Sequence, residues 1–123
     1  MITIGCDPEI FIKENNKVVS FHNKLNGLVK TPVDFSYGKI LEDGCALEFN
    51  LPPALSCNEF DRGIEEMLRD IRDKWDYSAV SCHEFDTKEI DSALCWESGC
   101  DRSINILSGQ KTPAVSYCDG FRA

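Results

Sequence analysis

Carboxylates are the side chains of this sequence whose spacing points most directly to chemistry. In the segment IGCDPEIFI, residues 4–12, Asp7 and Glu9 stand on either side of Pro8. Because residues two apart in a strand project to the same face, the two carboxylates are expected side by side, roughly 7 Å apart at their α-carbons. Two anions this close repel, so the pair suits a bound cation or free access to solvent. Pro8 cannot donate to a ladder, which favours a strand end and an open face.

A second group of acids lies in LEDGCALEFN, residues 41–50. Glu48 stands between two apolar residues of a strand-like run and is therefore expected on an open sheet face. Glu42 and Asp43 precede it and could reach the same region. Hard oxygen ligands of this kind suit Mg²⁺ or Mn²⁺, which bind substrate phosphates, rather than a softer metal. Acids near strand ends are also commonly just solvated, and spacing alone leaves both interpretations open.

The elements that would position these acids are predicted from hydrophobic periodicity and turn residues. Residues 2–13 are predicted to form a strand, and the asparagine pair at 15–16 a hairpin turn into a second strand at KVVSF, because asparagine tolerates left-handed backbone. Glycine and proline favour a loop over 23–38. Residues 45–51 have strand composition up to the double proline, after a break at Gly44.

The clearest predicted element is a helix over SCNEFDRGIEEMLRDIRDKW, residues 56–75. Ser56 followed three residues later by Glu59 is a capping box. The apolar residues fall on one helical face, which indicates a long amphipathic helix packed on a sheet. The residues expected on that face are Phe60, Ile64, Met67, Leu68, Ile71 and Trp75.

The remaining segments add short elements without a regular alternation of strands and helices. YSAVSCHEF, residues 77–85, is expected to add a strand, DTKEIDSAL, residues 86–94, a short helix or an irregular turn, and AVSYCDGFRA, residues 114–123, a short strand. This pattern predicts an α+β fold, with a mainly antiparallel sheet packed by the long helix. The length suits a single domain over residues 1–123.

Composition and charge argue against several classes of partner. The chain has 13 basic and 21 acidic residues, a net charge of −8, so no nucleic-acid partner is expected. No apolar run approaches the roughly 20 residues that span a bilayer, so no membrane association is expected either. The seven cysteines are odd in number and lack a Cys-x-x-Cys pair, which favours reduced, mostly buried thiols and a cytoplasmic location.

Three stretches of the sequence resemble one family. GCDPEIFI resembles the acid-x-acid strand of the glutamine synthetase and glutamate–cysteine ligase superfamily. It is closer still to the Gly-x-Asp-Pro-Glu-Phe-Phe start of phage carboxylate–amine ligases, the type-2 amidoligase group of the phiEco32-like kind. LEDGCALEFNLPPA is similar to that group's Glu-Asp-(small)-x-x-Leu-Glu-Phe-Asn-x-Pro-Pro-Ala segment, and GCDRSIN to its later Gly-Cys-x-x-x-x-Asn turn. The matches follow the family order and span about residues 4–105.

The resemblance implies a reaction and a set of ligands. Members of the family use ATP to phosphorylate a carboxylate, an amine then displaces the phosphate, and acids on a curved antiparallel sheet hold two or three divalent cations. By this resemblance Asp7, Glu9 and Glu48 would bind Mg²⁺ or Mn²⁺, with Glu42 or Asp43 a weaker candidate. The cofactors would be ATP and metal, the substrate a small molecule or peptide, and the location the host cytoplasm if the chain is phage-encoded.

The chain also departs from the family pattern. Family members continue through an Arg-(small)-Ala-Gly-Gly-His-x-His segment, which supplies a histidine ligand, and then through a second half with phosphate-binding basic residues. Arg122 matches the start of that segment and is the expected catalytic residue, Ala123 matches the next position, and neither histidine follows. His22 and His83 lie outside the matching motifs and are expected to be structural. The sequence therefore resembles the amino-terminal half of a ligase.

Two interpretations of function follow from that half. The first is a ligase subunit or half-domain that needs a second half, supplied by a second polypeptide, and that is inactive alone. The second is a catalytically inactive ligase-like fold repurposed as a phage interaction or structural protein, either a sealed monomer or a homo-oligomer. A large exposed apolar surface, where the second half would dock, is expected in the first case and not in the second. A third explanation is that the polypeptide is a truncated product of a longer gene.

Overall fold

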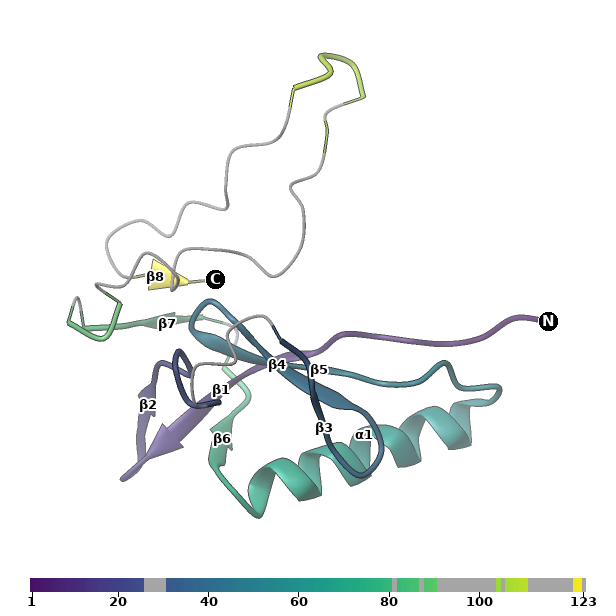
Figure 1. Cartoon of the computed structure of the whole chain (residues 1–123), viewed down its shortest axis with the longest axis horizontal. Coiled ribbons are helices and arrows are strands. Elements are labelled where there is room, and N and C mark those ends of the chain that lie inside the picture. Colours follow the sequence, from purple (N-terminus) through teal and green to yellow (C-terminus); the bar gives the residue numbers. More distant parts are fainter. Residues whose placement is uncertain are drawn as a thin grey trace.

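The computed structural model describes residues 1–25, 31–80, 82–86, 88–90, 104, 106–110 and 121–122. Within these ranges the fold is α+β, with one helix against an antiparallel sheet (Figure 1). The elements in chain order are β1 (Glu9–Glu14), β2 (Lys17–Val19), β3 (Val33–Asp34), β4 (Lys39–Asp43), β5 (Ala46–Asn50), α1 (Cys57–Arg72), β6 (Asp76–Ser78), β7 (His83–Glu84) and β8 (Phe121–Arg122).

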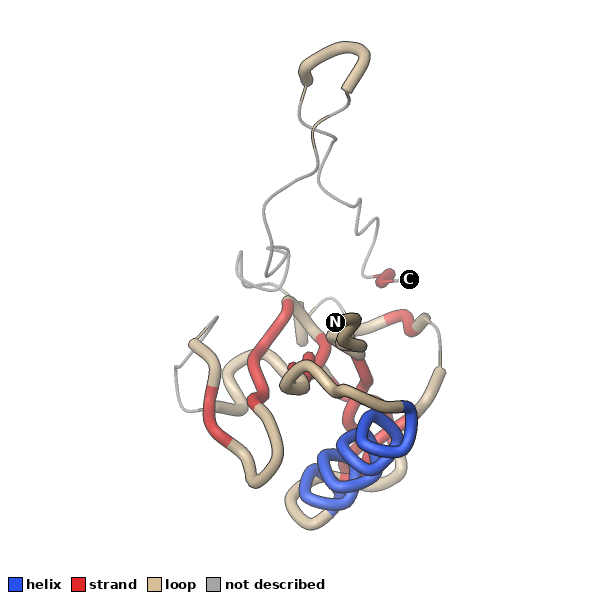
Figure 2. Tube along the Cα trace, turned by 90° about the vertical axis from the view of Figure 1, so that its right-hand side faces the viewer, coloured by secondary structure: helices blue, strands red, loops and turns tan. Residues whose placement is uncertain are grey.

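The sheet has six strands, and all its pairings are antiparallel. Five strands follow the order β2-β1-β5-β4-β3, while β6 also pairs with β1, and β7 and β8 form a separate pair. Figure 2 shows that the strands curl instead of lying in one plane, with α1 along one side. Since side chains alternate along a strand, β1, β4 and β5 present one face toward α1 and one face away from it.

Two tight hairpins set the register of the central strands. The turn between β1 and β2 is made by Asn15 and Asn16, whose φ angles are 52° and 63°, and Glu14 pairs with Lys17 across it. Between β4 and β5, Gly44 has a φ of 57° and Asp43 pairs with Ala46. Left-handed backbone at such positions suits asparagine and glycine, so the predicted hairpin at 15–16 and the break at Gly44 are both confirmed.

The predicted capping box forms at the start of α1 in a shifted version, because the Glu59 carboxylate reaches Leu55, one residue before the Ser56 cap, instead of Ser56 itself. The backbone N–H of Glu59 donates to Ser56 Oγ at 3.2 Å, and Glu59 Oε2 accepts from the backbone N–H of Leu55 at 2.7 Å. The helix buries Gly63, Met67 and Ile71 on its sheet-facing side. These contacts fix both the starting point of the helix and the side that it turns to the sheet.

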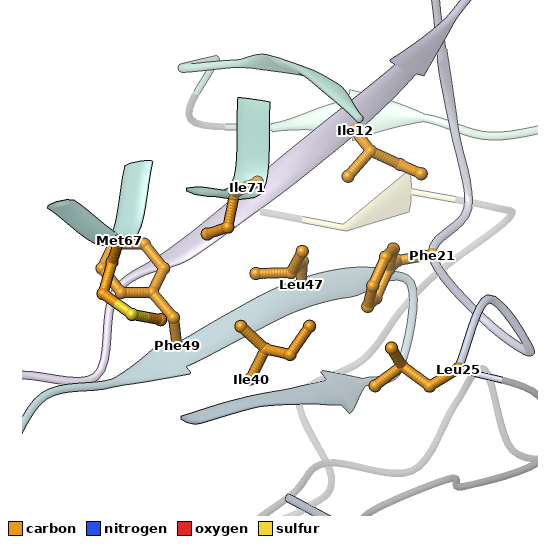
Figure 3. Packing of buried hydrophobic residues seen from close by; sticks show 8 residues of the cluster. All are labelled: Ile12, Phe21, Leu25, Ile40, Leu47, Phe49, Met67 and Ile71. Atoms are coloured by element: carbon orange, nitrogen blue, oxygen red, sulfur yellow. The ribbon is translucent and has the colours of Figure 1, made fainter. Parts of the chain in front are cut away.

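The main apolar core lies between α1 and the sheet (Figure 3). Met67 and Ile71 from the helix pack over residues from β1, β4 and β5 and from the turn after β2. The sheet-side members are Ile12, Phe21, Leu25, Ile40, Leu47 and Phe49. A second, smaller cluster occupies the opposite face of the sheet and consists of Phe11, Cys45, Ala46, Phe85 and Ile90.

The amino-terminal strand is shorter than predicted. β1 begins at Glu9, and of residues 1–8 only Ile4 forms a bridge, with Ala54, through backbone bonds of 2.8 and 2.9 Å. The reason lies in the facing segment, because β5 ends at Asn50 and is soon followed by Pro52 and Pro53, which have no N–H to donate. Without a continuous partner the ladder does not extend back to residue 2.

Other sequence predictions are refined or lie outside the described residues. The loop over 23–38 contains the two-residue β3, and the strand expected at 77–85 is divided between β6 and β7. Most of residues 86–94 and 99–105 and of the segment before β8 lies outside the described ranges. Among the described residues, no helix combines the length and the apolar character that crossing a bilayer requires.

The predicted state of the cysteines is borne out only in part. Cys6, Cys45, Cys57 and Cys82 are all free thiols, but only Cys45 is buried, whereas Cys57 and Cys82 are exposed. The other three cysteines lie outside the described residues.

Candidate metal centre

Three carboxylates from three strands gather on the sheet face that points away from α1. Glu9 of β1, Asp43 of β4 and Glu48 of β5 each place one oxygen so that all three oxygens lie within 4.8 Å of one another. Glu9 is exposed, Glu48 is half-buried, and Asp43 is buried with 5% of its surface accessible. The cluster therefore runs from the interior of the sheet to solvent.

Strand register explains why these three side chains meet. Glu9 pairs directly with Glu48 across β1 and β5, and paired residues of an antiparallel ladder project to the same face. Asp43 pairs with Ala46, which lies two residues before Glu48 and so points the same way. The two-residue turn at Gly44 thus decides which acid of β4 joins the cluster.

The donor set fits a hard divalent cation. All three ligand atoms are carboxylate oxygens, which magnesium and manganese prefer and softer metals do not. Opposite ligands of a magnesium ion are about 4.2 Å apart, twice its bond length of about 2.1 Å to oxygen. The three oxygens lie within 4.8 Å of one another, which is close to that span, and Glu9 is exposed.

Apolar residues border the cluster on the same face. Phe11 follows Glu9 by two residues, and Ala46 precedes Glu48 by two, so both flank the carboxylates. Phe85, just after β7, packs on Phe11 with ring centroids 5.6 Å apart. Phe11 and Ala46 are both buried, so the cluster has an apolar neighbourhood on that side, where electrostatic interactions are stronger.

Asp7, the first acid of the sequence motif, does not join the cluster. It is exposed and precedes β1, whose ladder starts where Phe49 N–H donates to the Pro8 carbonyl at 3.0 Å. The same-face argument for Asp7 and Glu9 requires a regular strand, and the strand begins only at Glu9. The charge of Asp7 acts instead on its neighbour Cys6: burial raises the pKa of this thiol, and Asp7 raises it further.

Glu42 points to the opposite face and is engaged there. Its side chain is 1% exposed, Oε2 accepts from the backbone N–H of Asn23, and Oε1 accepts from that of Leu25, both at 2.9 Å. His22 Nδ1 lies 3.7 Å from Glu42 Oε2. Glu42, which the sequence offered as a metal ligand in place of Asp43, is thus a structural residue that anchors the turn after β2, because strand alternation sends Glu42 and Asp43 to different faces.

The expected catalytic residue, Arg122, lies in β8. Its backbone pairs with His83 of β7, and the ring of His83 lies 6.2 Å from that of Phe11 and 4.8 Å from that of Phe85. Figure 1 shows β7 and β8 on the side of the sheet away from α1, the side that carries the acids. The side chain of Arg122 lies outside the described part of the chain, so its role stays a prediction.

Sequence reasoning gave too little weight to Asp43 and missed Asn50. Asn50 Nδ2 donates to Glu48 Oε1 at 2.7 Å, directly beside the cluster. The signal for Asp43 was available, because a two-residue turn at Gly44 and Cys45 pairs Asp43 with Ala46 and puts it on the face of Glu48. The signal for Asn50 was its place two residues after Glu48 in the same strand.

Comparisons of the chain with protein-family models, with curated proteins and with solved structures give no match. The resemblance to carboxylate–amine ligases therefore stays a prediction from the sequence motifs.

Proposed function

We propose that this chain is the acid-bearing half of an ATP- and divalent-metal-dependent carboxylate–amine ligase. The observation that carries the proposal is the meeting of Glu9, Asp43 and Glu48 within 4.8 Å on one sheet face. Glu9 belongs to the first of the three sequence segments that resemble the ligase family, and Asp43 and Glu48 belong to the second. It is part of the proposal that the curled sheet and α1, as a long amphipathic helix, form half of a glutamine-synthetase-like catalytic sheet.

Each carboxylate has a distinct part in the proposed site. Asp43, buried beside the β4–β5 turn, gives the centre a fixed anchor, and Glu48 holds the middle of the cluster from β5. Glu9 is exposed and can adjust as a nucleotide arrives. A bound magnesium or manganese ion would supply charge neutralisation for the triphosphate and orientation of its γ-phosphate.

The proposed reaction needs groups beyond these acids. Phosphoryl transfer to a carboxylate requires cationic side chains that hold the phosphates, and Arg122 on β8 is the candidate within this chain. The remaining phosphate-binding residues and the histidine ligand are assigned to a second polypeptide. Exposed apolar side chains at Ile2, Ile4 and Leu55, around the Ile4–Ala54 bridge, offer that polypeptide a surface to cover.

Metal binding is the first test of the proposal. Titration with Mn²⁺, followed by electron paramagnetic resonance, should show a bound ion in the wild-type chain. Removing one carboxylate by Glu9→Gln, Asp43→Asn or Glu48→Gln should weaken binding at least tenfold, because each removes a charged ligand. Glu65→Gln, the same change on an exposed turn of α1, is the matched control and should bind as the wild type does. Equal Mn²⁺ affinity in all four variants would rule out a metal centre at these carboxylates.

Turnover is the second test. The chain is co-expressed with the products of its neighbouring genes, and ADP and phosphate release is measured with Mg²⁺, ATP and mixed amino acids. We expect turnover in a copurified pair and none with the chain alone. Intact Mn²⁺ binding without turnover in any pair would instead favour the inactive ligase-like fold, repurposed for interaction or structure.

A further inference from the structure

We propose that Asn50 is a positioning residue for this metal centre, because its side-chain amide holds the Glu48 carboxylate in the orientation that faces Glu9 and Asp43. The inference rests on the proposed function, since it concerns the same cation. It adds a residue that donates a hydrogen bond to a ligand and is not itself an acid.

The contact that carries the inference is short and well placed. Asn50 Nδ2 donates to Glu48 Oε1 at 2.7 Å, and both side chains are half-buried. The two residues are separated by Phe49 in β5, so they project to the same face. A donor to an ionised carboxylate makes a stronger bond than a donor to a neutral group, and partial burial strengthens it further.

The backbone that carries Asn50 is held in place. Asn50 is the last residue of β5 and pairs with Lys39 of β4. Its carbonyl packs so tightly on Gly38 that a β-carbon there would lie 2.3 Å from the oxygen. The pairing with Lys39 and the close approach to Gly38 together hold the strand end from which the Asn50 amide reaches Glu48.

Fixing Glu48 matters because a glutamate side chain has many rotamers. A carboxylate that is already oriented loses less conformational entropy when a cation arrives. The amide engages one lone pair of Oε1, and each carboxylate oxygen has two, so Glu48 keeps the capacity to bind a cation. Partners that orient a metal ligand in this way typically change metal affinity by about 10- to 100-fold.

The experiment measures Mn²⁺ affinity by electron paramagnetic resonance in Asn50→Leu, a change that removes the donor and keeps the branching of the side chain. We expect affinity to fall about tenfold. Asn58→Leu, the same change at an exposed position in the first turn of α1, is the control and should bind as the wild type does. Unfolding by urea in EDTA verifies that each variant is folded, and Asn50→Ala, which cannot clash, is the second variant, with the same expected loss.

A double-mutant cycle distinguishes positioning from a general structural role. In a Glu48→Ala background, Asn50→Leu should cause no further loss of affinity, because no carboxylate remains for the amide to orient. A loss of equal size with and without Glu48 overturns the inference, since Asn50 would then act through the fold at large.

The outcomes also separate this inference from the proposed function. If the wild type binds Mn²⁺ and the folded Asn50 variants bind it equally well, the positioning role is overturned and the metal centre stands. If the wild type binds no Mn²⁺ while remaining folded, the metal centre fails and the role of Asn50 fails with it.

Discussion

Glu42 and Asp43 are neighbours in β4, yet their carboxylates lie on opposite faces of the sheet. On the face toward α1, Glu42 is 1% exposed and accepts two backbone hydrogen bonds from the turn after β2. On the other face, Asp43 meets Glu9 and Glu48, with three oxygens within 4.8 Å. Glu42 thus binds neutral backbone donors and connects β4 to the turn after β2, whereas Asp43 lies beside two other carboxylates.

The difference shows how the surroundings of a carboxylate determine its role. A buried acid whose oxygens are aimed at backbone N–H groups stabilises the fold, because the donors would otherwise be left without a partner. Acids that converge repel one another, and a divalent cation removes that repulsion. We therefore expect substitutions on the α1 face to act on stability and those on the acid face to act on metal binding.

The largest expected effect is that of Glu42→Ala. The change leaves the N–H groups of Asn23 and Leu25 without their acceptor and opens a small cavity, so the free energy of unfolding should fall by roughly 3 kcal/mol. Glu48→Ala, a matched change in the same hairpin, should cost less than about 1 kcal/mol when EDTA is present. Urea denaturation in EDTA measures both values. Equal losses would contradict the division of roles between the two faces.

A smaller effect is expected from Gly38→Ala, because Gly38, just before β4, packs against the backbone of Asn50 in β5. In Gly38→Ala the new β-carbon would meet the Asn50 carbonyl at 2.3 Å, so β4 and β5 must separate at that point. We expect a loss of roughly 2 kcal/mol in stability and a weaker Mn²⁺ affinity, because Asn50 moves with its strand.

The matched control for this change is Gly63→Ala, in which the new β-carbon meets the side chain of Tyr37 instead of the backbone. Its expected result is a smaller loss of stability and an unchanged Mn²⁺ affinity. If Gly63→Ala weakened Mn²⁺ binding as much as Gly38→Ala, the connection would not run through Asn50.

The smallest expected effect concerns Asp7, which the structure places next to Cys6 and outside the acid cluster. Burial and the charge of Asp7 raise the pKa of the Cys6 thiol above its ordinary value of 9.0, so at pH 8 the reactive thiolate is scarce. Asp7→Asn removes one cause and lowers the pKa, and the rate of Cys6 alkylation at pH 8 should rise by a factor of a few. Peptide mass spectrometry gives the rate at Cys6 separately from those at other cysteines.

The same measurement reports on Asp7 as a metal ligand. A cation bound to Asp7 would cancel its charge and speed alkylation of Cys6, whereas we expect saturating Mg²⁺ to leave the rate unchanged.

The sign of the pKa shift of Cys6 also has a consequence for stability. The contribution of Cys6 to stability is fully present below pH 9.0 and is lost as the pH rises through the folded-state pKa, because the unfolded chain ionises first.

The sequence by itself determined the local structure. The asparagines at 15–16 and Gly44 specify hairpins because they accept left-handed backbone, and Ser56 with Glu59 specifies the start of α1. The sequence also predicted that Glu48 projects to the sheet face opposite that of Leu47 and Phe49, because strand alternation is a local property. These features need no knowledge of distant contacts.

Only the tertiary structure decided which acids meet. The meeting of Glu9 with Glu48 depended on the register of β1 against β5, and Asp7 was left out because that ladder begins only at Glu9. Register joins residues that are far apart in the sequence, and a shift of one position moves every side chain to the other face. Composition and local spacing carry no measure of that register, whereas the paired strands fix it.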